Sequence, residues 1–266
     1  VLIIKNGEAY VTSQDFTWGV LAINVNKSVS LPGEELYLQM GVLSSSGKTI
    51  CDADLVLEIT NPLGVKKIFK TPEKGTEPPN KNFIFRSQEC QGNNVPDTPD
   101  YYAYYPTTMA GRYAMSLVNL DNQFKITDSF EVRDSVPFEI ERISATRINP
   151  FSANYTMTIR VKANSDFVGL ITEIIPQEFQ LIDGSGVQTV KNYNKEQKLI
   201  WKVSIKKDQT IELKYEYDAP NISPQLYLLG PAVVGQEGGS FLFEESRQWQ
   251  LASDVDTVVF LTTADT

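Results

Sequence analysis

Histidine is absent from the 266-residue chain, and its absence narrows the chemistry that the side chains could perform. Histidine is the commonest general base in enzymes and the commonest neutral metal ligand. A serine or cysteine nucleophile would therefore have no histidine to activate it. Neighbouring carboxylates such as Glu34 and Glu35, or Glu244 and Glu245, would point to opposite faces of a strand and could not flank one glycosidic bond. We expect no enzymatic activity.

Two cysteines, Cys51 and Cys90, are too few for a zinc site and lack C-x-x-C spacing. They form either a disulfide or two buried thiols. We expect the disulfide, because both residues would lie at strand ends in one domain and because a secreted or cell-surface location fits the rest of the sequence.

A tyrosine-rich run between residues 101 and 105 could supply rings that stack against sugars. Side chains alternate along a strand, so Tyr102 and Tyr104 would share one face and Tyr101 and Tyr105 the other. One pair is expected in the core and the other in an exposed strip. The candidate ligand-contact aromatics are Tyr101, Tyr105, Trp18 and Trp249.

The loop "QGNNVPDTPD" after Cys90 carries Asp97 and Asp100, whose carboxylates and neighbouring carbonyls could bind calcium. A dense acidic loop such as D-x-D-x-D-G is absent, so a solvated turn is the simpler interpretation. We expect no metal ion and no cofactor.

The overall composition excludes several classes of partner. A net charge of −9 and an isoelectric point near 4.7 argue against nucleic acid, because phosphate contacts need clustered lysine and arginine. The longest apolar runs, such as Leu226 to Val234, fall short of the ~20 residues that cross a bilayer. The sequence starts at Val1 without a signal peptide, so we expect the mature or trimmed part of a longer precursor.

Apolar residues recur at every second position in segments on both sides of residue 135, which predicts strands with one face on a core. No long segment has helical spacing, and turn residues recur about every 8 to 12 positions. The pattern restarts after "RDSVP", residues 133–137. We therefore expect an all-β protein with two tandem immunoglobulin-like β-sandwiches. The predicted units are an N-terminal strand or linker (1–16), two sandwiches (17–135 and 136–254) and a C-terminal strand or linker (255–266).

Residues 23–64, "INVNKSVSLPGEELYLQMGVLSSSGKTICDADLVLEITNPLG", resemble the macroglobulin-type immunoglobulin-like domain of alpha-macroglobulins and bacterial surface proteins. The resemblance rests on Asn26-Lys27, on Pro32-Gly33-Glu34, and on the turn from Ile59 to Gly64, whereas Ser30 stands where the family usually has tyrosine. Pro32 fixes φ and Gly33 can adopt positive φ, so this turn is structural.

Two further stretches carry resemblances. "DYYAYYPTTMAGRYAMSL" is similar to the penultimate hairpin of immunoglobulin-like modules, which implies that Tyr113 is a tyrosine-corner residue. The second half, with "YTMTIRVKANSDFVGLITEIIPQEF" and "LIWKVSIKKDQTIELKYEYDAP", resembles repeat modules of large bacterial and archaeal surface proteins. The thioester of protease-trapping macroglobulins needs Cys-Gly-Glu-Gln, but "CQGNN" follows at Cys90, so the trap chemistry is not expected here.

These resemblances imply a non-catalytic structural or adhesion module, extracellular or on the cell surface, acting as a spacer or protein-interaction segment. Its partners would be neighbouring domains of a longer protein or copies of itself. The alternative is a carbohydrate-binding accessory module of a surface enzyme.

The ends of the chain carry apolar runs outside the predicted sandwiches, "VLII" at residues 1–4 and "VVFL" at residues 258–261. An unpaired apolar strand exposes backbone donors and acceptors. We expect at least one run to add to a sheet edge of its own chain, of a neighbouring domain or of another copy. Pairing within the chain is the simplest version.

Overall fold

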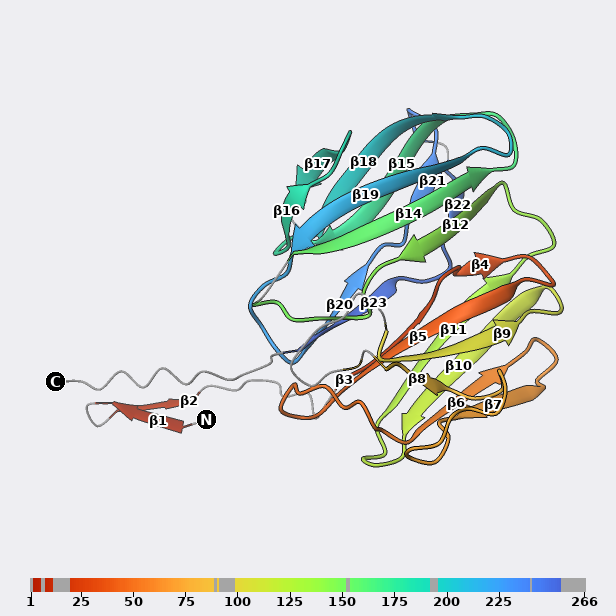
Figure 1. The fold of residues 1–266 in the computed structure, drawn as a ribbon. Helices are drawn as coiled ribbons and strands as arrows, with labels where there is room; N and C mark the ends of the chain where they lie inside the picture. Colours follow the sequence, from red (N-terminus) through yellow and green to blue (C-terminus); the bar gives the residue numbers. More distant parts are fainter. Residues whose placement is uncertain are drawn as a thin grey trace.

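The computed structural model describes residues 2–5, 8–11, 20–88, 90, 99–151, 154–191, 196–239 and 241–254. These residues form strands, turns and loops, and the predicted all-β class is confirmed (Figure 1). The described ranges accordingly contain no helix long and apolar enough to cross a membrane.

The first sandwich pairs a five-stranded sheet, ordered β4-β11-β10-β6-β7, with a four-stranded sheet, ordered β3-β5-β9-β8. Their inward side chains form one core. Apolar residues alternate along β6 and β10 as predicted, and Leu36, Leu38 and Met40 on β5 are all buried. The strands are β3 (Val20–Val25), β4 (Val29–Ser30), β5 (Glu35–Leu43), β6 (Leu55–Thr60), β7 (Lys66–Lys70), β8 (Phe85–Arg86), β9 (Tyr101–Pro106), β10 (Gly111–Asn119) and β11 (Lys125–Val132).

The second sandwich contains a four-stranded sheet (β12-β14-β19-β16), a five-stranded sheet (β17-β18-β15-β21-β22) and a three-stranded sheet (β13-β23-β20). One apolar cluster joins their inward faces. The strands are β12 (Phe138–Ile143), β13 (Arg147–Ile148), β14 (Tyr155–Ala163), β15 (Phe167–Pro176), β16 (Gln180–Asp183), β17 (Gln188–Lys191), β18 (Glu196–Ile205), β19 (Thr210–Asp218), β20 (Gln225–Leu229), β21 (Val233–Gly235), β22 (Phe241–Glu244) and β23 (Trp249–Ser253).

Two local predictions are confirmed. Gly33 has φ +90°, the left-handed conformation that the Pro-Gly turn requires. The Tyr113 hydroxyl donates to the Met109 carbonyl at 3.0 Å, which is the contact of a tyrosine corner. The second sandwich repeats this contact, since the Tyr155 hydroxyl donates to the Asn149 carbonyl at 3.2 Å.

The two sandwiches meet over an extended surface rather than at a bare linker. β11 ends at Val132 and β12 begins at Phe138, yet Val29 on β4 packs into the core of the second sandwich. A small apolar cluster of Val20, Ala22, Leu43 and Ala252 also spans both halves. The division into independently folding units at 17–135 and 136–254 remains a prediction.

The N-terminal run forms β1 (Leu2–Lys5), which pairs antiparallel with β2 (Glu8–Val11) as a separate two-stranded sheet. Among the described residues, neither strand joins a sheet of a sandwich. The second apolar run, residues 258–261, lies outside the described residues. Addition of either run to a sandwich edge therefore remains a prediction.

Candidate functional site: the joint between the two sandwiches

The open edge of β3 is closed by side chains of the second sandwich. β3 lies at one end of its sheet, where backbone donors and acceptors would be left without a neighbouring strand. The Ile23 N–H donates to Gln250 Oε1 at 2.9 Å, and the Ile23 carbonyl accepts from Arg247 Nη2 at 2.5 Å. The second sandwich thus supplies hydrogen bonds that a further strand would have supplied.

The adjacent Asn24 extends this pairing. Its side chain is fully buried, its Nδ2 donates to the Gln250 carbonyl at 2.7 Å, and its Oδ1 accepts from the Gln250 N–H at 2.8 Å. The side-chain amide therefore pairs with the backbone of β23 as a strand residue would. A buried amide left without these partners would carry a large desolvation penalty, so the contact fixes the spacing of β3 and β23.

Asp128 on β11 links the opposite sheet of the first sandwich to the same segment. Its Oδ2 accepts from Arg247 Nε at 3.0 Å and from Gln250 Nε2 at 2.8 Å. The Arg247 guanidinium is almost fully buried, so the pair is shielded from water and salt screens it little. We call the contacts of Ile23, Asn24, Asp128, Arg247 and Gln250 the joint.

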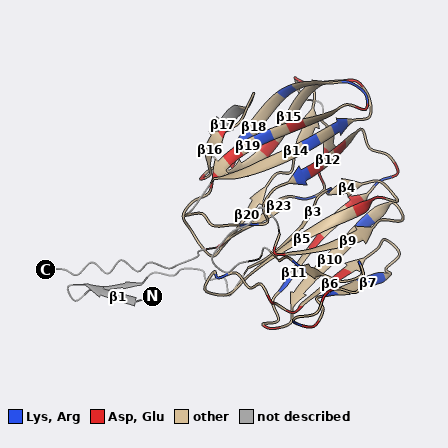
Figure 2. Ribbon diagram, in the orientation of Figure 1, with Lys and Arg blue, Asp and Glu red and all other residues tan. Residues whose placement is uncertain are grey.

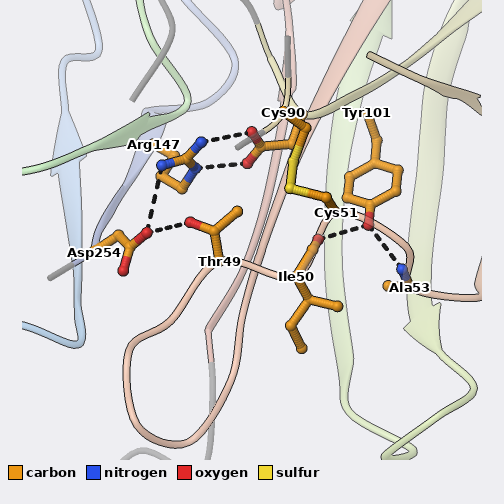
Figure 3. Close-up of a disulfide and its surroundings, with 9 residues drawn as sticks. Thr49, Ile50, Cys51, Ala53, Cys90, Tyr101, Arg147 and Asp254 are labelled. Carbon is orange, nitrogen blue, oxygen red and sulfur yellow. Dashed lines mark hydrogen bonds and ion pairs between the residues drawn. A yellow bond between two sulfur atoms is a disulfide. The ribbon is translucent and has the colours of Figure 1, made fainter. Parts of the chain in front are cut away.

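A second set of charges lies at the end of the joint where β23 finishes (Figure 3). Arg147 donates to both oxygens of Asp100, from Nε at 2.7 Å and from Nη2 at 2.8 Å, and its Nη1 lies 3.4 Å from Asp254. The Thr49 hydroxyl donates to the same Asp254 oxygen. Asp100 is therefore the ion-pair partner of Arg147 and not a free calcium ligand; Asp97 lies outside the described residues.

The predicted disulfide between Cys51 and Cys90 is present and closes a loop with a sequence separation of 39. It sits beside the Arg147 charges and beside Tyr101, whose hydroxyl donates to the Ile50 carbonyl at 2.6 Å and accepts from the Ala53 N–H at 2.9 Å (Figure 3). The crosslink therefore holds the hairpin from which Thr49 reaches Asp254.

A buried charge cluster occupies the core of the second sandwich. Arg142 on β12 is held bidentately by Glu173 on β15, at 2.8 and 2.7 Å, and donates from Nε to Glu245 at 2.9 Å. The Tyr215 hydroxyl donates to Glu173 at 3.1 Å, and the Ala232 N–H donates to Glu245 at 2.8 Å. These five residues form the core charge cluster, which connects the two main sheets of the sandwich.

The core charge cluster and the joint are neighbours along the chain. The Arg142 N–H donates to the Asn26 carbonyl in the first sandwich at 2.8 Å, and Glu245 precedes Arg247 of the joint by two residues. At the rim, Lys27 lies 3.2 Å from Glu139. The segment from Glu245 to Arg247, between β22 and β23, therefore contributes one charge to the core charge cluster and one to the joint.

Burial sets the protonation of two carboxyl groups. Burial raises the pKa of Glu173 above its ordinary value, against the opposing influence of Arg142, and the nearby Glu245 raises it further. Burial likewise raises the pKa of Asp254, although Thr49 and Arg147 act in the opposite direction. Both groups hold a proton more tightly in the folded chain than in the unfolded chain.

We predict that the wild-type protein gains stability relative to the Glu173→Gln variant as the pH falls from neutral toward the ordinary glutamate pKa of 4.5. A group whose folded pKa is raised contributes stability that is fully present below its unfolded pKa and is lost as the pH rises through its folded pKa. Urea unfolding of both proteins across this range gives the difference directly. Carboxylates with lowered pKa values, such as Glu139, are present in both proteins, so their contributions to stability cancel in the difference. A difference that is constant with pH would contradict the prediction.

The candidate ligand-contact aromatics are wrong at the positions that the structure describes. Tyr101, Tyr105 and Trp249 are 0%, 6% and 1% exposed. Tyr101 and Tyr105 take the inward positions of β9, and Trp249 Nε1 donates to the Ala145 carbonyl at 3.0 Å. Trp18 lies outside the described residues.

The other two tyrosines of β9, Tyr102 and Tyr104, form the exposed aromatic strip. Tyr37 on β5 and Phe85 on β8, the strands on either side of β9, complete it. Tyr102 stacks on Phe85 with ring centroids 5.0 Å apart, and Tyr37 packs against Tyr102 and Tyr104 at 5.8 and 5.4 Å. Lys81 Nζ lies 4.7 Å from the Tyr104 ring centre. The rings are only partly exposed and cover one another, so they form a compact cluster rather than an open row of ring faces.

No family model matches the chain, and no curated protein matches it. Among solved structures, alpha-2-macroglobulin from Salmonella reacted with methylamine is 15% identical with a TM-score of 0.34, covering 94% of this chain and 16% of its own. Native alpha-2-macroglobulin from E. coli is 13% identical with a TM-score of 0.30, covering 95% and 16%. Collagen adhesin from S. aureus is 13% identical with a TM-score of 0.27, covering 89% and 93%.

Macroglobulin structures and a bacterial adhesin are thus among the structural neighbours, as the sequence resemblance suggested. This chain spans 16% of the macroglobulin chains. Likenesses with these TM-scores carry no argument about function, which therefore has to come from the joint itself.

Proposed function

We propose that the chain is a non-catalytic structural or adhesion module that holds two β-sandwiches in one fixed orientation, as a spacer or protein-interaction segment. The observation that supports this most is the closure of the β3 edge by Gln250 and Arg247. Contacts between domains of one chain usually permit relative motion. Here, opening the joint would break the hydrogen bonds that the second sandwich makes to Ile23, Asn24 and Asp128 Oδ2, which makes a fixed orientation the favoured state.

We place the module outside the cell, as part of a secreted or cell-surface protein. The Cys51–Cys90 disulfide supports this location, because disulfides persist in oxidising compartments. Its partners would be neighbouring domains or copies of itself rather than nucleic acid. Acidic and basic residues are interspersed along the strands of both sandwiches (Figure 2), and the chain is acidic overall.

The absence of enzymatic activity and of a cofactor is part of the same proposal. The chain has no histidine, and the carboxylates of Glu173 and Glu245 are engaged by Arg142 inside a closed core. Carbohydrate binding, the alternative, would depend on the aromatic strip of Tyr37, Phe85, Tyr102 and Tyr104. Since these rings pack against one another, no observation favours that alternative.

If their orientation is fixed, the two sandwiches tumble in solution as one rigid body. Residual dipolar couplings of backbone amides in the full chain should fit a single alignment tensor in the wild type. The double variant Arg247→Ala and Gln250→Ala should give two different tensors, because it removes the hydrogen bonds that close β3.

Arg160→Ala is the matched control, since Arg160 forms ion pairs on the exposed face of the second sandwich and lies outside the joint. It should leave the single tensor unchanged. Two tensors in the wild type would overturn the proposed function. A single unchanged tensor in the double variant would show that Arg247 and Gln250 do not set the orientation.

A further inference from the structure

A groove of about 430 Å³ lies on the second sandwich between β15 and β20. Residues 174–176 of β15 form one wall, and residues 225–228 of β20 form the other. β15 pairs with β21 only over residues 170–172, and β20 ends its sheet, so neither wall has a neighbouring ladder on the groove side within the described strands. The Gly230 N–H donates to the Ile174 carbonyl at 2.6 Å and links the two walls.

Two carboxylates flank Pro176 at the end of β15. Glu196 lies opposite Pro176 in the pairing of β15 with β18. Glu178 lies on the turn after β15, which is closed by the Phe179 N–H donating to the Pro176 carbonyl at 3.1 Å. Both glutamates are exposed and line the groove, and neither forms an ion pair with a described residue. By contrast, Glu139 on β12 is paired with two lysines.

A buried hydroxyl without a partner belongs to the same groove. Tyr227 lines it and is 5% exposed, and its Oη has no hydrogen-bond partner among the described residues. The ring is held against Phe179, with ring centroids 4.9 Å apart. Burial, and to a smaller extent the nearby Glu178 carboxylate, raise the pKa of Tyr227 to about 12, so the hydroxyl remains neutral beside that carboxylate. Buried polar groups normally have a partner, so this hydroxyl indicates a missing donor or acceptor.

The other lining side chains restrict the class of ligand. Ile174, Leu226 and Leu228 offer apolar surface, and Gln225 and Gln248 offer amides. The carboxylates would repel an anion, and a wholly apolar ligand would cover them without giving them a partner. Lysine and arginine combine an apolar stem with a cationic head, and such a head forms strong hydrogen bonds with carboxylates.

We propose that this groove binds a lysine or arginine side chain that projects from a segment of a partner protein. The cationic head lies between Glu178 and Glu196 and donates to the Tyr227 hydroxyl, and the stem lies on the apolar wall. A protein segment is the source, because a volume typical of pockets for whole ligands leaves room for backbone beside the side chain. The unpaired edge of β20 can hydrogen-bond that backbone.

This inference rests on the protein-interaction role proposed above and names the chemistry of the partner. It uses none of the five residues that define the joint. Dipolar couplings test the joint and peptide binding tests the groove, so either can fail while the other holds.

The test is a titration of the isotope-labelled full chain with a short blocked peptide that has one lysine between glycines. Amides of Glu178, Glu196 and β20 should shift, with a dissociation constant on the order of 1 mM, the strength of one side chain rather than of a whole interface. The same peptide with norleucine in place of lysine lacks the charge, and n-butylamine lacks the backbone. Each should bind at least ~tenfold more weakly than the lysine peptide.

Three variants locate the contact. The double variant Glu178→Gln and Glu196→Gln should weaken binding at least ~tenfold, because neutral amides replace both carboxylates. Glu73→Gln with Glu77→Gln is the matched control: these exposed residues lie on a loop of the first sandwich, and their replacement removes the same net charge but should leave binding unchanged. Tyr227→Phe keeps the ring and should weaken binding about threefold, because it removes one neutral hydrogen bond.

Several results would overturn the proposal. One is the absence of amide shifts in the groove at ~10 mM lysine peptide, about ten times the expected dissociation constant. Others are equal binding of the norleucine peptide or of n-butylamine, equal losses in the two glutamine double variants, and unchanged binding in Tyr227→Phe.

Discussion

Replacing Arg142 with methionine is expected to destabilise the protein by about 3–5 kcal/mol, because Glu173 and Glu245 would remain buried without a cation. Arg142 is the residue that forms ion pairs with both carboxylates, at 2.7 Å from Glu173 and 2.5 Å from Glu245. Chemical denaturation of the full chain, followed by fluorescence of the buried Trp201 and Trp249, measures the loss.

Arg160→Met provides the comparison for the same substitution on the exposed face. Arg160 pairs with Glu212 at 2.9 Å, but its side chain is 44% exposed and water screens the pair, so the loss of stability should be far smaller than for Arg142→Met. The triple variant Arg142→Met, Glu173→Gln and Glu245→Gln should recover part of the lost stability, because it removes the unpaired charges. Equal losses of stability for Arg142→Met and Arg160→Met would show that the core charge cluster contributes no more to stability than an exposed ion pair.

Replacing both Cys51 and Cys90 with alanine is expected to lower the free energy of unfolding by ~4 kcal/mol. The crosslink closes a loop with a separation of 39 residues. It lowers the conformational entropy of the unfolded chain, which stabilises the folded state by about that amount. Denaturant unfolding of the wild type and the double variant measures the change. Intact mass after alkylation, with and without reductant, first establishes that the wild-type thiols are bonded.

The same variant should also weaken the contact between the two sandwiches at Asp254, because the crosslink holds the hairpin from which Thr49 donates to Asp254. Dipolar couplings should therefore fit a single tensor less well after the disulfide is removed. Free thiols in protein purified from an oxidising compartment, or an unchanged free energy of unfolding without the crosslink, would contradict this prediction.

The fold could be read from the sequence because its main signal is local. Alternation in segments such as Leu36 to Val42 depends only on the period of a strand, and it identified strands and the all-β class. The disulfide was expected because two cysteines are too few for a zinc site, both would lie at strand ends in one domain, and an extracellular location fitted the rest of the sequence. The tyrosine corner followed from a resemblance that extends over a single hairpin.

The joint could not be predicted in this way, because its contacts connect residues far apart in the chain. Asn24 and Gln250 are separated by 226 positions. An asparagine at one position gives no indication that a glutamine at the other is its partner. The aromatic assignment failed for a related reason. Alternation divides Tyr101 and Tyr105 from Tyr102 and Tyr104, but which pair faces inward depends on where the opposing sheet lies.

One signal for the core charge cluster was present in the sequence. Arg142 and Glu173 both occupy positions whose alternation assigns them to the core, next to Ile143 and Ile174 on the outer side. A charged residue at an inward position usually has a charged partner, because an unpaired buried charge is strongly unfavourable. Two such residues of opposite sign in one predicted sandwich would have been a reason to pair them.

The antiparallel contact between β3 and β23 determines how the module would respond to pulling. Val20, where the described body begins, packs against Ala252, near its last described residue, so the chain enters and leaves the body at neighbouring points. Tension between these points would act on β3 and β23 directly and load the hydrogen bonds of Asn24 and Gln250 in shear. Both sandwiches beyond that contact would carry almost no load. The module would therefore project sideways from a stretched chain and add little to its length until the β3–β23 contact gives way.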